Sequence, residues 1–290
     1  MVHTAQPATV EAMMMESTYT RHREIAWRGG HTSSTSRLIA EESAIALTYN
    51  GSTHAVMMGT PADLEDFGVG FSLTEGIIAR ASEIASIELI SNELGMEVRM
   101  WLNGDRAATL AARRRAISGP VGCGLCGIES LEQACRAPSR VEGPGLAFHA
   151  RDLLHAMQAL SPLQTLNQHT RSVHAAAFWH PRAGITLVRE DVGRHNALDK
   201  LAGAIVSEGR SASDGAVLLT SRVSVEMVQK AAMIGAPVIV AVSAPTALAI
   251  RTADEAGITL LAIARDDGYG VFTHPRRVLL PEEAAPRVGC

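Results

Sequence analysis

The stretch GAVLLTSRVSVEMVQKAAMIGAPVIVAVSAPTALAIRTADEAGITLLAIA, residues 215–264, decides the fold of this chain. It contains three short apolar runs rich in Val, Leu and Ile, namely GAVLLT, PVIVAVS and ITLLAIA. Between them lie two segments with the apolar spacing of helices, SVEMVQKAAMIG and TALAIRTADEAG. Strands that alternate with helices form parallel pairs, because a parallel connection has to cross back over the sheet. The stretch therefore predicts an α/β fold with a largely parallel sheet covered by helices.

The segments just before it extend the same domain. ARDLLHAMQALSPL (150–163) has amphipathic helical spacing, and NALDKLAGAIVSEG (196–209) predicts a helix that Gly209 ends. SVHAAAFWH (172–180) and GITLVRE (184–190) are typical of a strand pair. We expect this domain to span residues 116–290 and to begin at a Gly/Pro-rich junction.

The first part of the chain predicts a smaller α+β domain over residues 21–115, preceded by a flexible tail over residues 1–20. AIALTYNGSTHAVMM (44–58) is typical of a hairpin that turns at Asn50-Gly51. PADLEDFGVGFSLTEGII (61–78) predicts a helix with Pro61 at its start. ASIELI (85–90) and GMEVRMWLN (95–103) predict two strands.

The composition excludes several classes of protein. The chain has 290 residues, of which 47% are hydrophobic and 19% charged, so it has enough apolar material for a sizeable core. A net charge of −4 and an aromatic content of 4% argue against nucleic acid as a partner. No apolar run reaches the roughly 18 residues of a membrane span, and no secretory signal begins the chain, so we expect a cytoplasmic protein without a membrane partner.

The most reactive stretch is GPVGCGLCGIES (119–130), where Cys123 and Cys126 form a C-x-x-C pair among glycines. Thiols in such pairs often have a depressed pKa and supply the thiolate that attacks another sulfur. Zinc binding, disulfide exchange and sulfur transfer all use this spacing. A four-ligand zinc site needs two more ligands, and neither Cys135 nor any histidine has the usual spacing for them. A thioredoxin-like protein has the pair near its N-terminus, at the start of a helix. The position of Cys123 and Cys126 among glycines in the middle of the chain argues against this function.

Three predicted strand-to-helix turns carry polar residues. REDVGRHN (189–196) combines Glu190, Asp191, Arg194 and His195 ahead of a helix, with Asn196 as its candidate N-cap. The turn after GAVLLT holds Thr220, Ser221 and Arg222, and the next one holds Ser243 and Thr246. Hydroxyls, backbone N–H groups and an arginine at a helix start are suited to a phosphate. Each turn alone fits an ordinary capped helix equally well, whereas together they predict a phosphorylated, nucleotide-like ligand at one edge of the sheet.

The last strand is followed by Arg265, Asp266, Asp267 and Gly268, which belong to the same predicted edge. A carboxylate there is able to accept hydrogen bonds from a guanine, although an acidic surface turn explains the spacing as well. His174 lies in a mostly apolar strand, and a histidine buried with satisfied hydrogen bonds is the favoured interpretation.

With these residues assembled, the sequence resembles the FdhD family, the sulfur-carrier accessory proteins that formate dehydrogenases require. The resemblance covers nearly the whole chain after the first 20 or so residues. It rests on motifs in a specific order, among them YNGSTHAVMMGTPADLEDFGVGFSLTEGII, RRRAISGPVGCGLCGIE, HAAAF, EDVGRHNALDKLAG, SRVSVEMVQKAAMIGAPVIVAVSAPT and THPRR.

The resemblance implies a sulfurtransferase with a cytidine deaminase-like three-layer α/β/α domain and a smaller N-terminal α+β domain. A cysteine desulfurase passes sulfur to the first cysteine of the C-x-x-C, Cys123, as a persulfide. The sulfur then goes to the molybdenum of a bis(molybdopterin guanine dinucleotide) cofactor bound as cargo, before that cofactor enters formate dehydrogenase. Cys126 matches the second cysteine and either relays sulfur or takes no part. A homodimer is expected, with no metal of its own.

The resemblance also implies a nucleotide-binding stretch, which matches IARDDG: Ile263, Ala264, Arg265, Asp266, Asp267 and Gly268. With Arg194, His195, Ser221 and Arg222 these residues form the expected cofactor site, which a guanine nucleotide would mimic.

Three other functions use parts of the same pattern. A zinc deaminase needs H-x-E followed by P-C-x-x-C, but Ala176 stands where the glutamate must be and the cysteines precede His174, so the sequence argues against deamination. A chaperone that holds the molybdenum cofactor without moving sulfur, and a structural zinc protein, stay open at this point.

Overall fold

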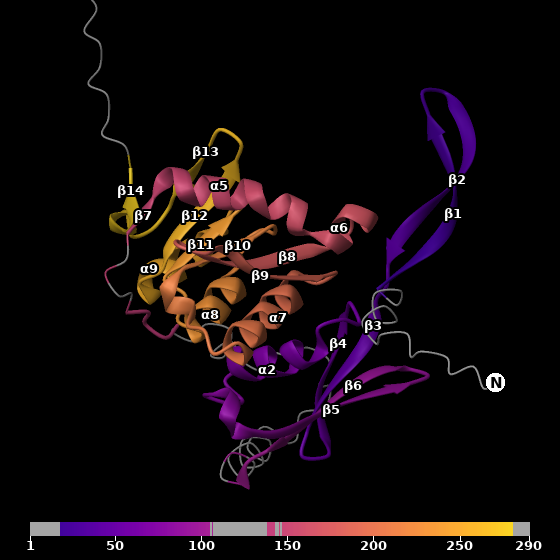
Figure 1. Cartoon of the computed structure of the whole chain (residues 1–290), viewed down its shortest axis with the longest axis horizontal. Coiled ribbons are helices and arrows are strands. Elements are labelled where there is room, and N and C mark those ends of the chain that lie inside the picture. The colour runs from indigo at the N-terminus through magenta and orange to yellow at the C-terminus, as the bar shows by residue number, and fades with distance from the viewer. Residues whose placement is uncertain (1–17, 105, 107–137, 143–144, 146, 281–290) are drawn as a thin grey trace, which may run out of the picture.

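The computed structural model describes residues 18–104, 106, 138–142, 145 and 147–280 (Figure 1). The C-x-x-C stretch and all four cysteines lie outside the described residues, as do most of the predicted tail and the expected boundary at residues 115–116. No helix in the described part of the chain is long and apolar enough to cross a membrane.

A six-stranded mixed sheet forms the larger layer. Its strands are β8 (His174–His180), β9 (Gly184–Asp191), β10 (Ala216–Leu219), β11 (Val238–Ala241), β12 (Thr259–Arg265) and β13 (Gly268–Val271). Their order is β13-β12-β11-β10-β8-β9. The three central strands β10, β11 and β12 are parallel, as their alternation with helices predicts, but β8, β9 and β13 are added antiparallel. The expectation of a largely parallel sheet therefore holds only at the centre, because short turns join the outer strands and a short turn permits only antiparallel pairing.

Helices cover both faces of this sheet and complete three layers. The helix α5 (Ala150–Leu160) packs on one face, and α7 (Arg194–Ser207), α8 (Val225–Met233) and α9 (Ala247–Ala256) pack on the other (Figure 1). Separate apolar cores lie on the two sides of the sheet. The remaining short elements are α6 (Thr165–Thr170), the 3₁₀ helices η1 (Ala81–Glu83), η2 (Ser161–Leu163), η3 (Ala212–Asp214) and η4 (Pro275–Arg277), and the strand pair β7 (Phe148–His149) and β14 (Val278–Leu279).

A second sheet of four strands has the order β4-β3-β6-β5. It consists of β3 (Ser43–Tyr49), β4 (Ser52–Gly59), β5 (Ile84–Asn92) and β6 (Gly95–Leu102), and α2 (Leu64–Thr74) packs on one face. The predicted hairpin is confirmed, with Asn50 and Gly51 both at positive φ. The helix expected from Pro61 begins only at Leu64, because Asp63 is left-handed (φ 52) and cannot continue a right-handed helix.

A hairpin that the sequence analysis missed precedes this sheet. The strands β1 (Tyr19–Arg28) and β2 (His31–Ala40) pair along their whole length. Gly29 and Gly30 make the turn at φ 56 and 83. Two glycines between β-rich runs are a recognised hairpin signal, so the sequence did contain the information. Strand β1 also enters the predicted tail, which was placed one or two residues too far along the chain.

The two sheets are joined by an unusually close crossing of α2 and α7 (Figure 1). A Cβ on Gly70 of α2 would overlap the backbone carbonyl of Asp199, and a Cβ on Gly203 of α7 would overlap the carbonyl of Asp66. Only glycine permits backbones to approach this closely. These two positions therefore set the distance between the two halves of the molecule.

Replacing Gly70 with alanine is expected to lower the free energy of unfolding by about 2 kcal/mol or more, because overpacking outweighs the roughly 1 kcal/mol of added helix propensity. Chemical denaturation measures the change. Gly104→Ala is the control, since a Cβ at Gly104 meets no atom of the described residues within 4 Å. Equal stabilities of the two variants would contradict the close crossing.

Candidate functional site

The polar turns lie in order along one edge of the six-stranded sheet. The strands β9, β10, β11 and β12 all end at this edge, where β8 begins. Backbone contacts connect the neighbouring segments: Thr220 N donates to Ala175 O at 3.1 Å, Val223 forms a bridge with Pro245, and Ile263 N donates to Ser243 O at 3.4 Å. The fold therefore brings the turns at residues 190–196, 220–222, 243–246 and 263–268 to one edge of the sheet, which we call the rim.

Asp191 is not available to a ligand, because its carboxylate is fully buried and fully used. It pairs with Lys200 Nζ at 2.7 Å, and both side chains are 0% exposed. It also accepts hydrogen bonds from Thr60 N (2.9 Å), Gly193 N (2.7 Å) and Asn196 Nδ2 (3.0 Å). A buried charge with this many partners is compensated in place. Asp191 therefore stabilises the turn between β9 and α7 through these internal contacts.

Two further residues of this turn differ from the sequence-based expectation. Asn196 is not the N-cap of α7: Gly193 occupies that position, and Asn196 is buried within the first turn, where its amide donates to Met58 O at 2.8 Å. Asn196 serves the contact between the two sheets. Glu190 accepts from the backbone N–H groups of Leu166 (2.8 Å) and Asn167 (2.9 Å) and so caps the start of α6. Burial raises the pKa of Glu190, and these hydrogen bonds oppose that rise.

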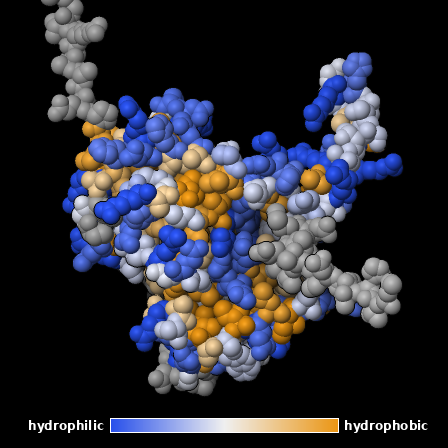
Figure 2. Space-filling model, in the orientation of Figure 1, coloured by the Kyte–Doolittle hydropathy of each residue, from blue (hydrophilic) through white to orange (hydrophobic). Residues whose placement is uncertain are grey.

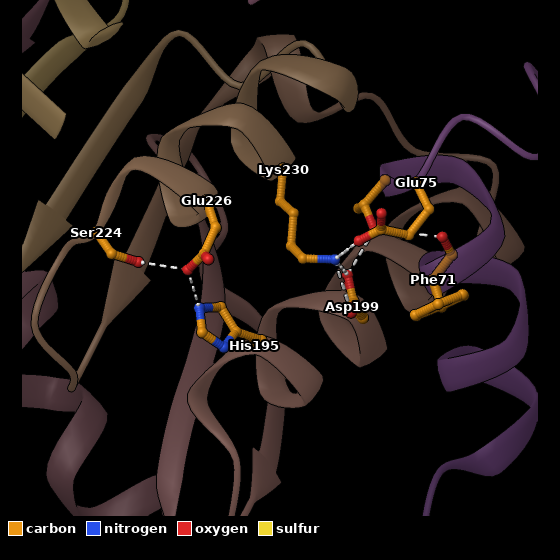
Figure 3. A network of polar contacts seen from close by, with 8 residues as sticks. Phe71, Glu75, His195, Asp199, Ser224, Glu226 and Lys230 are labelled. Carbon is orange, nitrogen blue, oxygen red and sulfur yellow. Dashed lines mark hydrogen bonds and ion pairs between the residues drawn. The ribbon is translucent and has the colours of Figure 1, made fainter. Parts of the chain in front are cut away.

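Arg194 and His195 remain at the start of α7, facing α8. His195 Nε2 lies 2.9 Å from Glu226 Oε2, and Ser224 Oγ lies 3.2 Å from the same carboxylate oxygen (Figure 3). Burial holds the pKa of His195 below its ordinary value, with Arg194 and Lys230 adding to the effect and Glu226 opposing it. The imidazole is therefore mainly uncharged near neutral pH, and because its Nε2 faces the Glu226 carboxylate, its Nδ1 is the nitrogen left to accept a hydrogen bond. The sequence analysis did not identify Glu226, although a Ser-x-Glu at a predicted helix start was visible.

A second buried ion pair lies deeper, between α2, α7 and α8. Lys230 Nζ is 2.9 Å from Asp199 Oδ1, 2.7 Å from Glu75 Oε1 and 3.0 Å from Thr74 Oγ1 (Figure 3). Burial disfavours the charge on Lys230, but the carboxylates of Asp199 and Glu75 outweigh it and raise its pKa. Sequence reasoning missed this network, although Asp199 and Lys200 stood out as charges in an otherwise apolar helix.

The groups that stay free at the rim are mainly cationic. Arg194 Nε is buried without a hydrogen-bond partner among the described residues. Arg222 and Arg265 are exposed, and neither forms an ion pair within the described part of the chain. His174 is half-buried, and burial followed by Arg194 lowers its pKa.

The hydroxyl groups of the rim have different roles. Thr220 Oγ1 accepts from Ala175 N at 2.8 Å and is committed to the sheet. Ser221 is buried, and its Oγ donates to the carbonyl of Arg222 at 3.2 Å. Thr246 caps α9 by accepting from Ala249 N at 3.2 Å. Of these predicted hydroxyls, Thr220 and Thr246 are structural, and the oxygen of Ser221, which donates to a carbonyl, keeps the capacity to accept a hydrogen bond.

The stretch IARDDG forms an irregular corner between β12 and β13. Ile263 has positive φ (57) within a bulge, and its side chain is exposed. Ala264 packs in the core beneath α5, so only its backbone is available to a ligand. Arg265, Asp266 and Asp267 are exposed at the turn, and Gly268 begins β13. The carboxylates expected to accept from a guanine are thus at the rim, but four strand positions away from the start of α7 along the sheet order.

The structure therefore defines a mixed α/β protein whose sheet edge carries arginines, a mainly uncharged imidazole and a helix start that has no side-chain cap among the described residues. The model of the FdhD/NarQ family matches residues 40–279. The chain belongs to this family, as its motifs predicted.

Named relatives of this chain support the family assignment. The chain is 54% identical over 266 residues to a sulfur carrier protein FdhD of Agrobacterium fabrum, covering 92% of this chain and 98% of that protein. It is 51% identical over 252 residues to the protein of the same name from Cupriavidus necator, covering 87% of each. A solved structure from Desulfotalea psychrophila, assigned as a formate dehydrogenase accessory protein, aligns with a TM-score of 0.69 at 26% identity and covers 90% of this chain and 100% of that one.

Removing the charge of Lys200 is expected to destabilise the fold strongly. In Lys200→Met the carboxylate of Asp191 stays buried without its cation, which typically costs about 3–5 kcal/mol of unfolding free energy. The double variant Asp191→Asn/Lys200→Met should regain part of the loss. Arg210→Met, which removes an exposed pair with Glu208, is the control and should cost less than about 1 kcal/mol. Denaturation curves for the four proteins decide, and a Lys200→Met loss no larger than the control contradicts the role given to the pair.

Proposed function

We propose that this protein is a persulfide sulfur carrier that accepts sulfur on Cys123 from a cysteine desulfurase and passes it to the bis(molybdopterin guanine dinucleotide) molybdenum cofactor of formate dehydrogenase. The observation that carries the proposal is the cationic rim described above, present in a chain whose relatives are named sulfur carriers. A rim with unpaired arginines suits a cargo with several phosphates, which a carrier of sulfur alone would not need.

The sulfur-accepting step is a thiol exchange. The Cys123 thiolate attacks the outer sulfur of the donor's cysteine persulfide, so that a new S–S bond forms while the bond between that sulfur and the donor cysteine breaks. The donor leaves as a thiolate, and Cys123 becomes the persulfide. No external oxidant or reductant is consumed, because the transferred sulfur keeps its oxidation level.

The rim supplies the binding groups for the cargo. Arg222 and Arg194 are suited to hold phosphate oxygens, together with Ser221 and the N–H groups at the start of α7, which have no side-chain cap among the described residues. Asp266 or Asp267 is suited to accept from the N–H groups of a guanine, and Arg265 to add positive charge there. Neutral His195 is able to accept one hydrogen bond at Nδ1 without adding charge. The internal pair Asp191–Lys200 keeps these groups in place without competing for the ligand.

Sulfur loading is tested directly by mass. The purified protein, incubated with a cysteine desulfurase and cysteine, should gain one sulfur atom per chain, and Cys123→Ala should gain none. Cys126→Ala is the matched control, and it also decides whether the second cysteine relays sulfur. If Cys123→Ala still supports a fully sulfurated, active formate dehydrogenase in cells, the protein is a cofactor chaperone and the sulfur-transfer proposal is wrong.

Nucleotide binding tests the rim separately from sulfur chemistry. Guanosine diphosphate, used as the probe in calorimetry, should bind Arg222→Ala about tenfold more weakly, the expected loss for one charge-assisted hydrogen bond. Arg210→Ala is the control, because Arg210 lies beyond the far end of α7 and pairs with Glu208. Equal affinities of the two variants would remove Arg222 from the proposed site.

A further inference from the structure

The hairpin β1–β2 projects from the molecule as an arm (Figures 1 and 2). Nearly all of its residues are exposed, and its most exposed large apolar side chains are Ile25 at 79% and Trp27 at 73%. A two-stranded ribbon without a packed face is only marginally stable in water. An arm that keeps a tryptophan and an isoleucine in solvent is therefore built for contact with something else.

One face of the arm carries a continuous stripe. Side chains alternate along a strand, so Arg21, Arg23, Ile25 and Trp27 point to the same side of β1. Their cross-strand neighbours include the small hydroxyl residues Ser36, Ser34 and Thr32. Serine and threonine side chains are too small to cover the indole of Trp27 or the sec-butyl side chain of Ile25. The stripe of Arg21, Arg23, Ile25 and Trp27 is therefore left open by its own hairpin.

The charge of the arm is opposite to that of the chain. Residues 19–40 contain four arginines, no lysine, no aspartate and one glutamate, whereas the whole chain has a net charge of −4. A basic stripe that ends in Ile25 and Trp27 complements an acidic surface with an apolar recess. Tryptophan and arginine are also the residues that contribute most to binding energy at protein interfaces.

The base of the arm lies close to the rim. The ring of Tyr19 lies 5.4 Å from that of His169, and Arg37 Nη2 donates to Thr170 O at 3.3 Å. His169 and Thr170 belong to α6, which leads directly into β8 and its first residue, His174, at the rim. A partner held by the arm would therefore lie beside the candidate site.

We propose that the arm docks the client formate dehydrogenase, through an acidic client surface with an apolar recess that receives Ile25 and Trp27. The proposal rests on the proposed function for the identity of the client. Delivery of a cofactor requires the client to approach the rim, and an arm rooted at the rim holds it there.

Binding is measured between the full-length protein and purified formate dehydrogenase apoenzyme from the same organism, without sulfur transfer. Ile25→Ser/Trp27→Ser should weaken the affinity at least tenfold. His22→Ser/Ala26→Ser makes two serine substitutions on the opposite face of the same strand and should leave the affinity within about twofold. Arg23→Glu should weaken binding and flatten its dependence on salt. Circular dichroism and guanosine diphosphate affinity check that the body of each variant is intact.

Three outcomes would overturn the proposal. The stripe and control variants bind the client equally, the stripe variant loses affinity for the cysteine desulfurase instead of the client, or it changes only the oligomeric state. Failure of the proposed function is distinguishable, since it appears as absent sulfur on Cys123 while binding through the arm is unchanged. If the stripe variant still gains sulfur on Cys123 and binds the client with unaltered affinity, only the proposal for the arm is wrong.

Discussion

The buried pair Asp191–Lys200 is the interaction on which the rest of the structure depends. Its two charges come from the end of β9 and the middle of α7, but the backbone N–H and carbonyl of Thr60, in the other sheet unit, complete their coordination. The Asp191–Lys200 pair therefore links the two sheets at a point that is fully buried from solvent. The same carboxylate also fixes Gly193 and Asn196, so the start of α7 has no freedom to turn. Arg194 and His195 are placed at the rim as a consequence.

The helix α7 carries both structural and functional constraints. Its Gly203 permits the close crossing with α2, and its Asp199 receives Lys230 from α8. Since α8 is positioned by that contact, its Glu226 meets His195 at the rim. Charges buried below the rim thus determine which groups are free above it. This arrangement explains why the helix contains Asp-Lys in the middle of an apolar pattern.

Three parts of the chain divide the proposed work. Sulfur chemistry belongs to the C-x-x-C stretch, cargo binding to the rim, and client docking to the arm. The ion pairs buried below the rim hold its side chains in place, and fixed donors suit a multidentate anionic ligand. The arm is separate from these ion pairs, so variation of its sequence would leave the rim unchanged.

Local pattern predicted a good part of this protein. Strand–helix alternation over residues 215–264 predicted the central parallel strands, Asn50-Gly51 predicted its hairpin, and the ordered motifs predicted the family. The strand pair β8–β9 was predicted as well, whereas the antiparallel strand β13, the N-cap position of Gly193 and the internal use of Asn196 were not. The sequence by itself determined which elements form and which family they belong to, because those depend on neighbours in the chain. Only the tertiary structure decided which charges are buried and which stay free, because contacts such as Thr60 with Asp191 join residues 131 positions apart.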